Sequence, residues 1–308
     1  MVIETYNTLI ARNKRNSWLL IGLFVLIFIG IGLLIGWVWG GDWGFSIVVA
    51  SGAAIAAFLL TLLSYYGGAS MVLAISRAKP IEKADDPQLF NVVEELSIAA
   101  GLPMPKVYLI DEPAPNAFAT GRDPAHSAVA ITTGLREKLN RDELQGVMAH
   151  EMSHVRNHDI LFAMLMAVMV GVLVMLADVF LRSLWFGAGS RRRRDSEGGG
   201  YLQLILLIIA IVLAILAPIL ARIIQLAMSR QREYLADASA VELTRNPYGL
   251  ANALRKIAND PAELKVANRA TAHLYIVHPL KKTKKRSSLF DTHPPIEDRI
   301  ERLLSLTV

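Results

Sequence analysis

Apolar residues gather in long stretches of the chain, and the first two of these predict a pair of membrane-spanning helices. Residues 17–41 contain no charged side chain, and neither do residues 43–76. Each stretch exceeds the roughly 20 apolar residues with which a helix spans the hydrocarbon core of a bilayer. Only Asp42 separates the two stretches, so residues 1–76 are expected to form a tight transmembrane hairpin.

Basic residues indicate the orientation of this hairpin. Lysine and arginine stand just outside both spans, at Arg12, Lys14, Arg15, Arg77, Lys79 and Lys83. The turn between the spans carries neither residue type. Because the cytoplasmic flanks of membrane spans are enriched in Lys and Arg, residues 1–16 and the chain just after residue 77 are predicted to lie in the cytoplasm.

Two further apolar stretches, residues 160–177 and 198–221, predict a second hydrophobic hairpin over residues 160–221. Four arginines, residues 191–194, lie between them, and their role stays open. If both stretches cross the membrane, these arginines lie outside, against the usual charge bias. The hairpin therefore either crosses fully or enters the protein or membrane without crossing, and the chain has up to four transmembrane helices.

The polar regions, residues 77–159 and 222–308, are predicted to form one discontinuous cytoplasmic domain. Asp86 as a cap, Pro87 at the first helical position and Gly101 as a stop predict one helix. Runs rich in strand-forming residues predict strands at 106–110 and 128–132, with a shorter candidate at 116–121.

Composition supports membrane contact and restricts the chemistry. Hydrophobic residues make up 53% of the 308 residues and charged residues only 19%, so part of the chain is expected to contact lipid. The chain has no cysteine, which excludes disulfides, thiolate metal ligands and a cysteine nucleophile. The net charge of +5 is typical of loops near anionic headgroups, and no aromatic-basic pattern indicates nucleic acid binding.

The first polar region contains the sequence His-Glu-Met-Ser-His, which begins at His150. His154 follows four residues later, so on a helix both imidazoles share a face and can bind one cation. Glu151 is placed beside them to hold and deprotonate a metal-bound water. Asn140 and Glu143 have the spacing of a capping box, and the helix they start is expected to run through both histidines. Whether it continues into the third apolar stretch stays open.

A catalytic zinc site needs a third protein ligand and an open position. Glu233 is the best candidate, because Asp237 lies on the same helical face and can accept a hydrogen bond from a ligand histidine, which fixes its tautomer. His158 competes as a ligand, since it follows His154 by four residues. One helix cannot easily wrap three ligands around a tetrahedral ion, so Glu233 is preferred and one Zn²⁺ per chain is expected.

Four segments together resemble the motif set of HtpX-type membrane zinc proteases, which are relatives of the CAAX prenyl endopeptidase. They are HEMSH at residues 150–154, SRQREYLAD at 229–237, NAFATG at 116–121 and THPPIEDR at 292–299. The resemblance covers nearly the whole chain. It implies an α+β zincin fold of the gluzincin type, mostly helical, with a cleft along the edge of a small sheet. It also implies endoproteolysis in membrane-protein quality control, in the inner cell membrane.

The resemblance assigns further roles at the site. It makes Asn116, Ala117, Phe118 and Ala119 the edge strand beside the cleft, and an exposed edge can pair with an extended substrate backbone. It places His293 close to the metal, where the ring could donate a hydrogen bond to the tetrahedral oxyanion. The alternative for His293 is a turn histidine that caps the final helix.

These features predict a zinc-dependent membrane endopeptidase in which Glu151 takes a proton from water and delivers it to the leaving amine. The expected partners are membrane lipid and misfolded or membrane polypeptides, and not nucleic acid. One alternative is a non-hydrolytic metal-binding scaffold or transporter, but the first two spans lack the ionisable residues that would favour transport. Another is a prenyl-processing protease, which needs a large chamber among more spans than these. Cleavage specificity and oligomeric state are not predicted.

Overall fold

The computed structural model describes residues 6–169, 171–172, 175, 211–212, 230–262, 264, 271–277 and 294–306. The helices are α1 (Tyr6–Gly40), α2 (Trp43–Ile75), α3 (Pro87–Ala100), α4 (Thr133–Lys138), α5 (Arg141–Arg156), α8 (Arg230–Thr244), α9 (Pro247–Ala258) and α10 (Ile296–Ser305). A further apolar helix spans Asp159–Met169. The strands are β1 (Ala78–Pro80), β2 (Lys106–Ile110), β3 (Ala117–Gly121) and β4 (Ser127–Thr132). The described part of the chain is therefore mostly helical with one small sheet, as expected.

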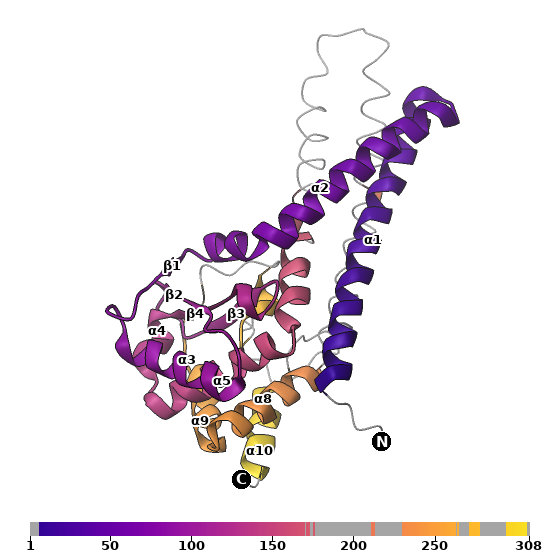
Figure 1. The fold of residues 1–308 in the computed structure, drawn as a ribbon. Coiled ribbons are helices and arrows are strands. Elements are labelled where there is room, and N and C mark those ends of the chain that lie inside the picture. Colours follow the sequence, from indigo (N-terminus) through magenta and orange to yellow (C-terminus); the bar gives the residue numbers. More distant parts are fainter. Residues whose placement is uncertain are drawn as a thin grey trace.

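Helices α1 and α2 form a long pair that leans away from the rest of the protein (Figure 1). Both are long and apolar enough to cross a membrane, over Ala11–Trp37 and Trp43–Ile75, and only 22% of the most apolar window of each is buried. Gly41 turns the chain with φ 67°, and the Asp42 carboxylate caps α2 by accepting the Phe45 N–H at 2.9 Å. The predicted helical hairpin is present, and its outward apolar surface suits lipid.

The sheet has the strand order β1-β2-β4-β3, so β3 forms one edge. Strands β2 and β4 run parallel, whereas β1 and β3 pair antiparallel with their neighbours. Lys106 is paired with Ala128, and Ala117 with Ile131. The three strands expected from the sequence are confirmed, and the short strand β1 is an addition to them.

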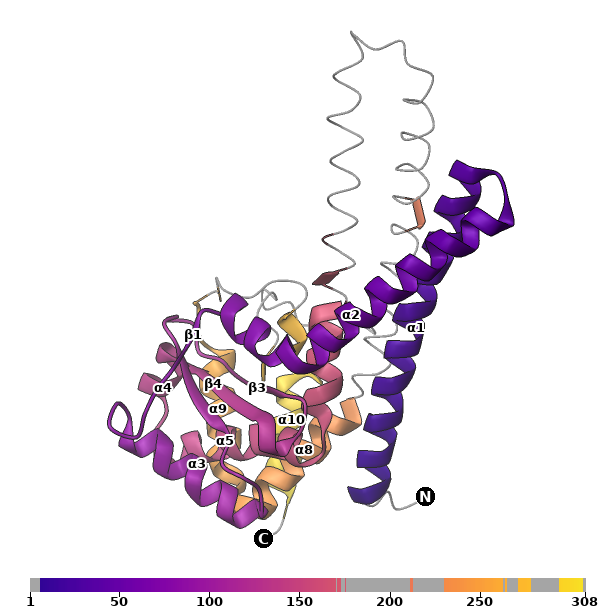
Figure 2. The ribbon, with the colours of Figure 1, turned by 45° about the horizontal axis from the view of Figure 1, so that its top comes forward.

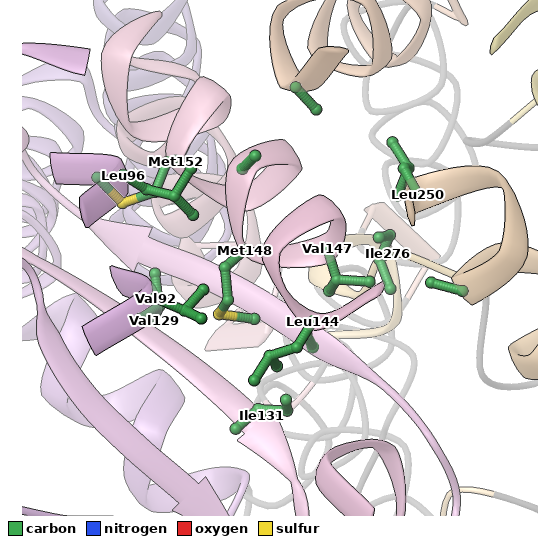
Figure 3. Close-up of a cluster of buried hydrophobic side chains, with 14 of the residues drawn as sticks. Val92, Leu96, Val129, Ile131, Leu144, Val147, Met148, Met152, Leu250 and Ile276 are labelled. Carbon is green, nitrogen blue, oxygen red and sulfur yellow. The ribbon is translucent and has the colours of Figure 1, made fainter. Parts of the chain in front are cut away.

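Alternate residues of β4 enter two different cores. Val129 and Ile131 face a large core built mainly with α3, α5 and α9. Ala128 and Ala130 face a second core that contains Val72 at the end of α2. In Figure 2 the end of α2 lies on one side of the sheet and α3 and α5 lie on the other. Part of the large core appears in Figure 3, including Val92, Leu96, Leu144, Val147, Met148, Met152, Leu250 and Ile276.

Local capping fixes the helix starts as the sequence predicted. The Asp86 carboxylate accepts the N–H of Leu89 at 3.0 Å, and Gly101 ends α3 in the left-handed conformation at φ 65°. Helix α5 begins with a complete capping box between Asn140 and Glu143, in which each side chain accepts the other residue's backbone N–H at 2.9 Å. This cap places the histidine motif on the buried face of α5.

Helix α5 does not continue into the third apolar stretch, a point that the sequence left open. Helix α5 ends at Arg156, and His158 adopts φ 56°, which is uncommon for a residue other than glycine. A new helix, Asp159–Met169, then starts and packs its buried residues against α1 and α2. Nearly all of the remaining second hydrophobic hairpin, including residues 191–194, lies outside the described residues.

Candidate active site

Helix α5 carries His150 and His154 on one face, with their rings turned toward one another. Their Nε2 atoms are 3.2 Å apart, and the ring planes are nearly perpendicular at 88°. The His150 side chain is 1% exposed and that of His154 18%. The two rings therefore direct one nitrogen each into the same small space.

A carboxylate contacts each ring at Nδ1, the nitrogen that does not face the other ring. Nδ1 of His150 lies 2.9 Å from Oδ1 of Asp237, and Nδ1 of His154 lies 3.1 Å from Oδ2 of Asp159. Because an ionised carboxylate only accepts hydrogen bonds, both Nδ1 atoms carry the proton, and each neutral ring has its lone pair at Nε2. Two facing lone pairs repel unless a proton or a metal cation lies between them. Nitrogens bound at about 2.0–2.1 Å to one tetrahedral zinc ion are about 3.3–3.4 Å apart, close to the spacing found.

Glu233 on α8 adds an oxygen donor to the two nitrogens. Its Oε2 lies 3.6 Å from Nε2 of His150, and its Oε1 lies 3.6 Å from Nε2 of His154. One ligand atom from each of the three residues lies within 4.8 Å of the others. Two imidazole nitrogens and one carboxylate oxygen are a donor set of catalytic zinc sites, so these residues fit the metal that the sequence predicted.

The charges buried around the histidines also suit a divalent cation. They belong to four acids and two arginines, Glu151, Asp159, Glu233, Asp237, Arg232 and Arg299. With every acid ionised and both histidines neutral, the negative charges of these six exceed the positive ones by two. Buried charge is costly unless it is compensated, and a bound cation is often the largest local charge in such a site.

The surroundings push the pKa values of the two histidines apart. Burial opposes the charged form of both rings. At His150 burial prevails over the hydrogen bond to Asp237, and the pKa lies below its usual value. At His154 the hydrogen bond to Asp159 and the charge of Glu233 outweigh burial and raise the pKa to about 9. The acids around His154 therefore stabilise positive charge at this position, and a cation bound between two neutral rings would supply it.

Glu151 lies next to this donor set and is 2% exposed. Burial raises the pKa of its carboxyl to about 7, while His154 and a hydrogen bond from the backbone N–H of Ala119 act in the opposite direction. A carboxyl group that titrates near neutrality can take a proton and give it back during one reaction. Glu151 therefore has the properties of a general base.

The outer edge of β3 is partly covered by the chain itself. All five residues of β3 are buried. The Ile276 N–H donates to the Ala117 carbonyl at 3.0 Å, and the Asn116 side-chain amide donates to the Val277 carbonyl at 2.9 Å. Residues 271–277 therefore occupy the end of the edge that the sequence analysis expected to be exposed.

A pocket of about 510 Å³, counted out to its open mouth, lies over the donor set. Ala119 and Glu151 line it together with His150, His154 and Glu233. Residues 273–276 form part of its wall. A concave pocket with several buried titratable groups is the usual form of an active site.

The other candidate histidines differ in their placement. His158 lies beyond the end of α5 and is absent from the donor group found among the described residues. His126 is exposed and bonds to Asp123 at 2.8 Å. His293 lies outside the described residues, so its role stays a prediction.

Two further residues hold the site. Asp159 was given no role from the sequence, and Arg299 was predicted to support His293, which lies outside the described residues. Asp159 holds His154, and Arg299 binds Asp237 through Nε at 2.9 Å and Nη2 at 2.7 Å. Asp159 follows His154 by five residues, so on a continuous helix it would not share the face of the two histidines. The sequence gives no signal for this contact unless the break after α5 is already known.

A metalloprotease is the class that this donor set and the family comparison define. Residues 83–307 match the model of Peptidase family M48, and the chain belongs to this family. Similar proteins carry the name Protease HtpX homolog. That of Caldanaerobacter subterraneus subsp. tengcongensis is 47% identical over all of both chains, and that of Lactobacillus helveticus is 46% identical over 96% of this chain and 97% of its own. The resemblance drawn from the four segments is confirmed, and a non-hydrolytic scaffold or transporter is not favoured.

The crystal structure of S. mikatae Ste24p is similar with a TM-score of 0.49 and 19% identity. The similarity covers 92% of this chain and 62% of that chain.

Proposed function

We propose that this metalloprotease is a zinc-dependent endopeptidase whose metal ligands are His150, His154 and Glu233, with one Zn²⁺ per chain. The observation that carries the proposal is the pair of Nε2 atoms, 3.2 Å apart, on rings whose Nδ1 atoms contact carboxylates. Nitrogen donors favour zinc over Mg²⁺ and Ca²⁺, which prefer oxygen ligands.

Glu151 acts first as general base and then as general acid. When bound, zinc supplies Lewis acidity, which polarises the scissile carbonyl and makes water nucleophilic near neutral pH. Glu151 removes a proton from water as the water oxygen bonds to the carbonyl carbon. It then delivers this proton to the leaving nitrogen as the C–N bond breaks, which yields a carboxylic acid and an amine. Its pKa of about 7 suits both transfers.

Asp237 keeps the first ligand in its binding form. It accepts a hydrogen bond from the Nδ1–H of His150 and so leaves the Nε2 lone pair directed at the metal position. Arg299 holds Asp237 with two hydrogen bonds, which fixes the carboxylate in turn. Asp237 thus acts on the metal through His150 and is not a ligand itself.

The predicted substrate strand is Asn116, Ala117, Phe118 and Ala119, and the substrate backbone lies along its outer edge at the Ala119 end, because residues 276 and 277 already bond to Asn116 and Ala117. Ala119 supports this placement, because it lines the pocket beside Glu151. Since the Ala117 carbonyl already accepts a hydrogen bond from Ile276, pairing starts at the Ala119 end of the strand. His293 donates to the oxyanion that forms when water adds to the carbonyl.

The protein is a multi-pass protein of the inner cell membrane with its catalytic domain in the cytoplasm. The parts are a transmembrane hairpin over residues 1–76, a domain made of residues 77–159 and 222–308, and a second hydrophobic hairpin over residues 160–221. The basic flanks of the first hairpin support this orientation. Membrane lipid surrounds the spans, and the substrates are misfolded or membrane polypeptides that are removed in membrane-protein quality control.

Casein hydrolysis by the detergent-purified full chain tests this function. The wild type is expected to hydrolyse casein, to stop when a chelator removes the metal, and to resume when zinc is returned. Glu151→Gln should keep its zinc and its melting temperature but lose hydrolysis by about 10²–10⁴-fold, because an amide cannot accept the water proton. Substantial hydrolysis by a zinc-loaded Gln variant would contradict the assignment of the base.

A further inference from the structure

One side chain of the N-terminal membrane helix reaches the surroundings of the candidate metal site. Asn13 lies near the start of α1, just before the first apolar stretch. It is 2% exposed, although Lys14 and Arg15 directly after it are exposed. An asparagine is costly to bury unless its amide is hydrogen-bonded. The burial of Asn13 therefore directs attention to the hydrogen bonds of its amide.

Asn13 bridges the break between α5 and the helix that follows. Its Nδ2 donates to the carbonyl of Asn157 at 2.9 Å and to Oδ1 of Asp159 at 2.6 Å. Both partners are acceptors, so the amide nitrogen must face them. Between these partners stands His158 at φ 56°, a conformation that persists only where its surroundings hold it. Asn13 therefore clamps the two ends of this turn.

Asp159 carries the contact onward to the donor set. While Oδ1 of Asp159 accepts from Asn13, Oδ2 lies 3.1 Å from Nδ1 of His154. Nη1 of Arg232 is 3.4 Å from Oδ1 as well. The carboxylate is thus held between Asn13, Arg232 and His154, and its orientation determines that of the imidazole.

We propose that Asn13 is a positioning residue for metal binding, through which membrane helix α1 acts on the zinc affinity of the cytoplasmic site. The inference rests on the proposed zinc ligands. Partners that orient a ligand histidine change metal affinity by about 10–100-fold when they are removed. Asn13 stands one step further out. Among the described residues, its amide makes the one hydrogen bond that joins α1 to Asp159.

The test is the zinc affinity of the full chain in detergent, measured by competition with a chromophoric chelator. Asn13→Leu keeps the number of side-chain heavy atoms and the branch at Cγ but has no donor, and it should weaken zinc binding by about 10-fold or more. Ser17→Ala is the matched control. Ser17 is equally buried on α1, but its hydroxyl donates only to the Asn13 carbonyl of the same helix at 3.0 Å, so zinc affinity should not change.

A double-mutant cycle shows whether Asn13 acts through Asp159. In an Asp159→Ala background, Asn13→Leu should have little further effect on zinc affinity, because its target is already missing. Asn13→Ala should show the same direction of change and serves if the Leu variant does not fold. If the Asn13 variants bind zinc as tightly as Ser17→Ala does, the proposal is overturned, even if their melting temperature is lower. Asn13 would then only stabilise the packing of α1. A full-sized effect without Asp159 would overturn it too.

The wild type and His154→Ala separate this proposal from the proposed function. If the wild type binds no zinc, or His154→Ala binds it equally well, the ligand assignment fails and the inference falls with it. If the wild type binds zinc through His154 and only the Asn13 variants behave as the control, the inference alone fails.

Discussion

Arg299 connects the C-terminal helix to the centre of the site through a single side chain. It is 1% exposed, binds Asp237 with two nitrogens, and donates through Nη1 to the Ile276 carbonyl at 3.0 Å. The same Nη1 lies 3.7 Å from Oε2 of Glu233. An arginine keeps its charge in a protein, so burying Arg299 is costly unless acids lie beside it. The buried acids Asp237 and Glu233 likewise depend on Arg299 to compensate their charge.

Removal of His293 tests its predicted role at the oxyanion. His293→Ala should lower kcat by about 10²–10³-fold and leave KM nearly unchanged, because the interaction exists mainly in the transition state. Zinc content should stay the same, since His293 is not counted as a ligand. The measurement is steady-state kinetics with metal analysis and melting temperature on one preparation.

His126→Ala serves as the control for this variant, because His126 is an exposed histidine that bonds to Asp123. A turn histidine at position 293 would lower the melting temperature and leave turnover of the folded protein near normal. That outcome would remove His293 from the site without affecting the ligands or Glu151.

Spacing along a helix determined which site residues the sequence could predict. Glu233 and Asp237 are four residues apart on α8, as His150 and His154 are on α5, so a rule about helical faces found all four. Asp159 could not be found in this way, because its contact with His154 depends on a turn that interrupts the helix.

At the scale of one element, Asp86 combines two functions at the start of α3. It caps the helix and accepts from Nη2 of Arg136 at 3.0 Å. Asp86→Ala should lower the free energy of unfolding at pH 7 by about 1–2 kcal/mol, because both the cap and the ion pair are lost. Asp86→Asn should cost less, since an asparagine still caps. Chemical denaturation of the two variants and the wild type measures these differences.

The pH dependence follows from the same contacts. Burial acts to raise the pKa of Asp86, but the hydrogen bonds from Arg136 and Leu89 outweigh it and hold the pKa below its usual value. A carboxyl with a lowered folded pKa stabilises the fold above its unfolded pKa of about 3.9, and this contribution is lost as the pH falls through the folded pKa. The gap between wild type and Asp86→Ala should therefore shrink below about pH 4; an unchanged gap at pH 2 would contradict the ion pair.

Elements with local signals were predicted, and those that depend on distant partners were not. Helix α3 has its cap, its proline and its glycine within its own sequence. Strand β1 has only three residues, Ala78–Pro80, and exists because it pairs with β2. Likewise, the end of α5 is set by a left-handed His158 that Asn13 clamps from another helix. Local propensity cannot show either of these contacts.

Helices α1 and α2 pack against the part of the protein that carries the candidate site. The end of α2 contributes Val72 and Leu73 to the core on one face of the sheet, and Asn13 of α1 contacts the turn after α5. The site therefore lies near the start of α1 and the end of α2. Because these helix ends share packing with the rest of the protein, dividing the chain between residues 76 and 77 would not give two independent folding units.

Single cysteines test the membrane orientation, because the chain has no native cysteine to interfere. Arg15→Cys, Lys83→Cys and Glu263→Cys should react with an impermeant maleimide only from the cytoplasmic side. Asp42→Cys, in the turn between the first two spans, should react only from the other side and serves as the control. Residue 263 belongs to the same predicted cytoplasmic region as Glu233, which must lie on the same side of the membrane as His150 to bind one metal ion. Labelling of the Glu263 variant only from outside would therefore contradict the proposed topology.

The proposed metal site is tested by the zinc content of two purified variants, Glu233→Ala and His158→Ala. Both change a residue that the sequence offered as the third ligand, but only Glu233 lies within the donor group of His150 and His154. Metal analysis after equal exposure to zinc should give one zinc per chain for the wild type and for His158→Ala. Glu233→Ala should hold much less. Full zinc occupancy in Glu233→Ala, or loss of zinc in a folded His158→Ala, would contradict the proposed site.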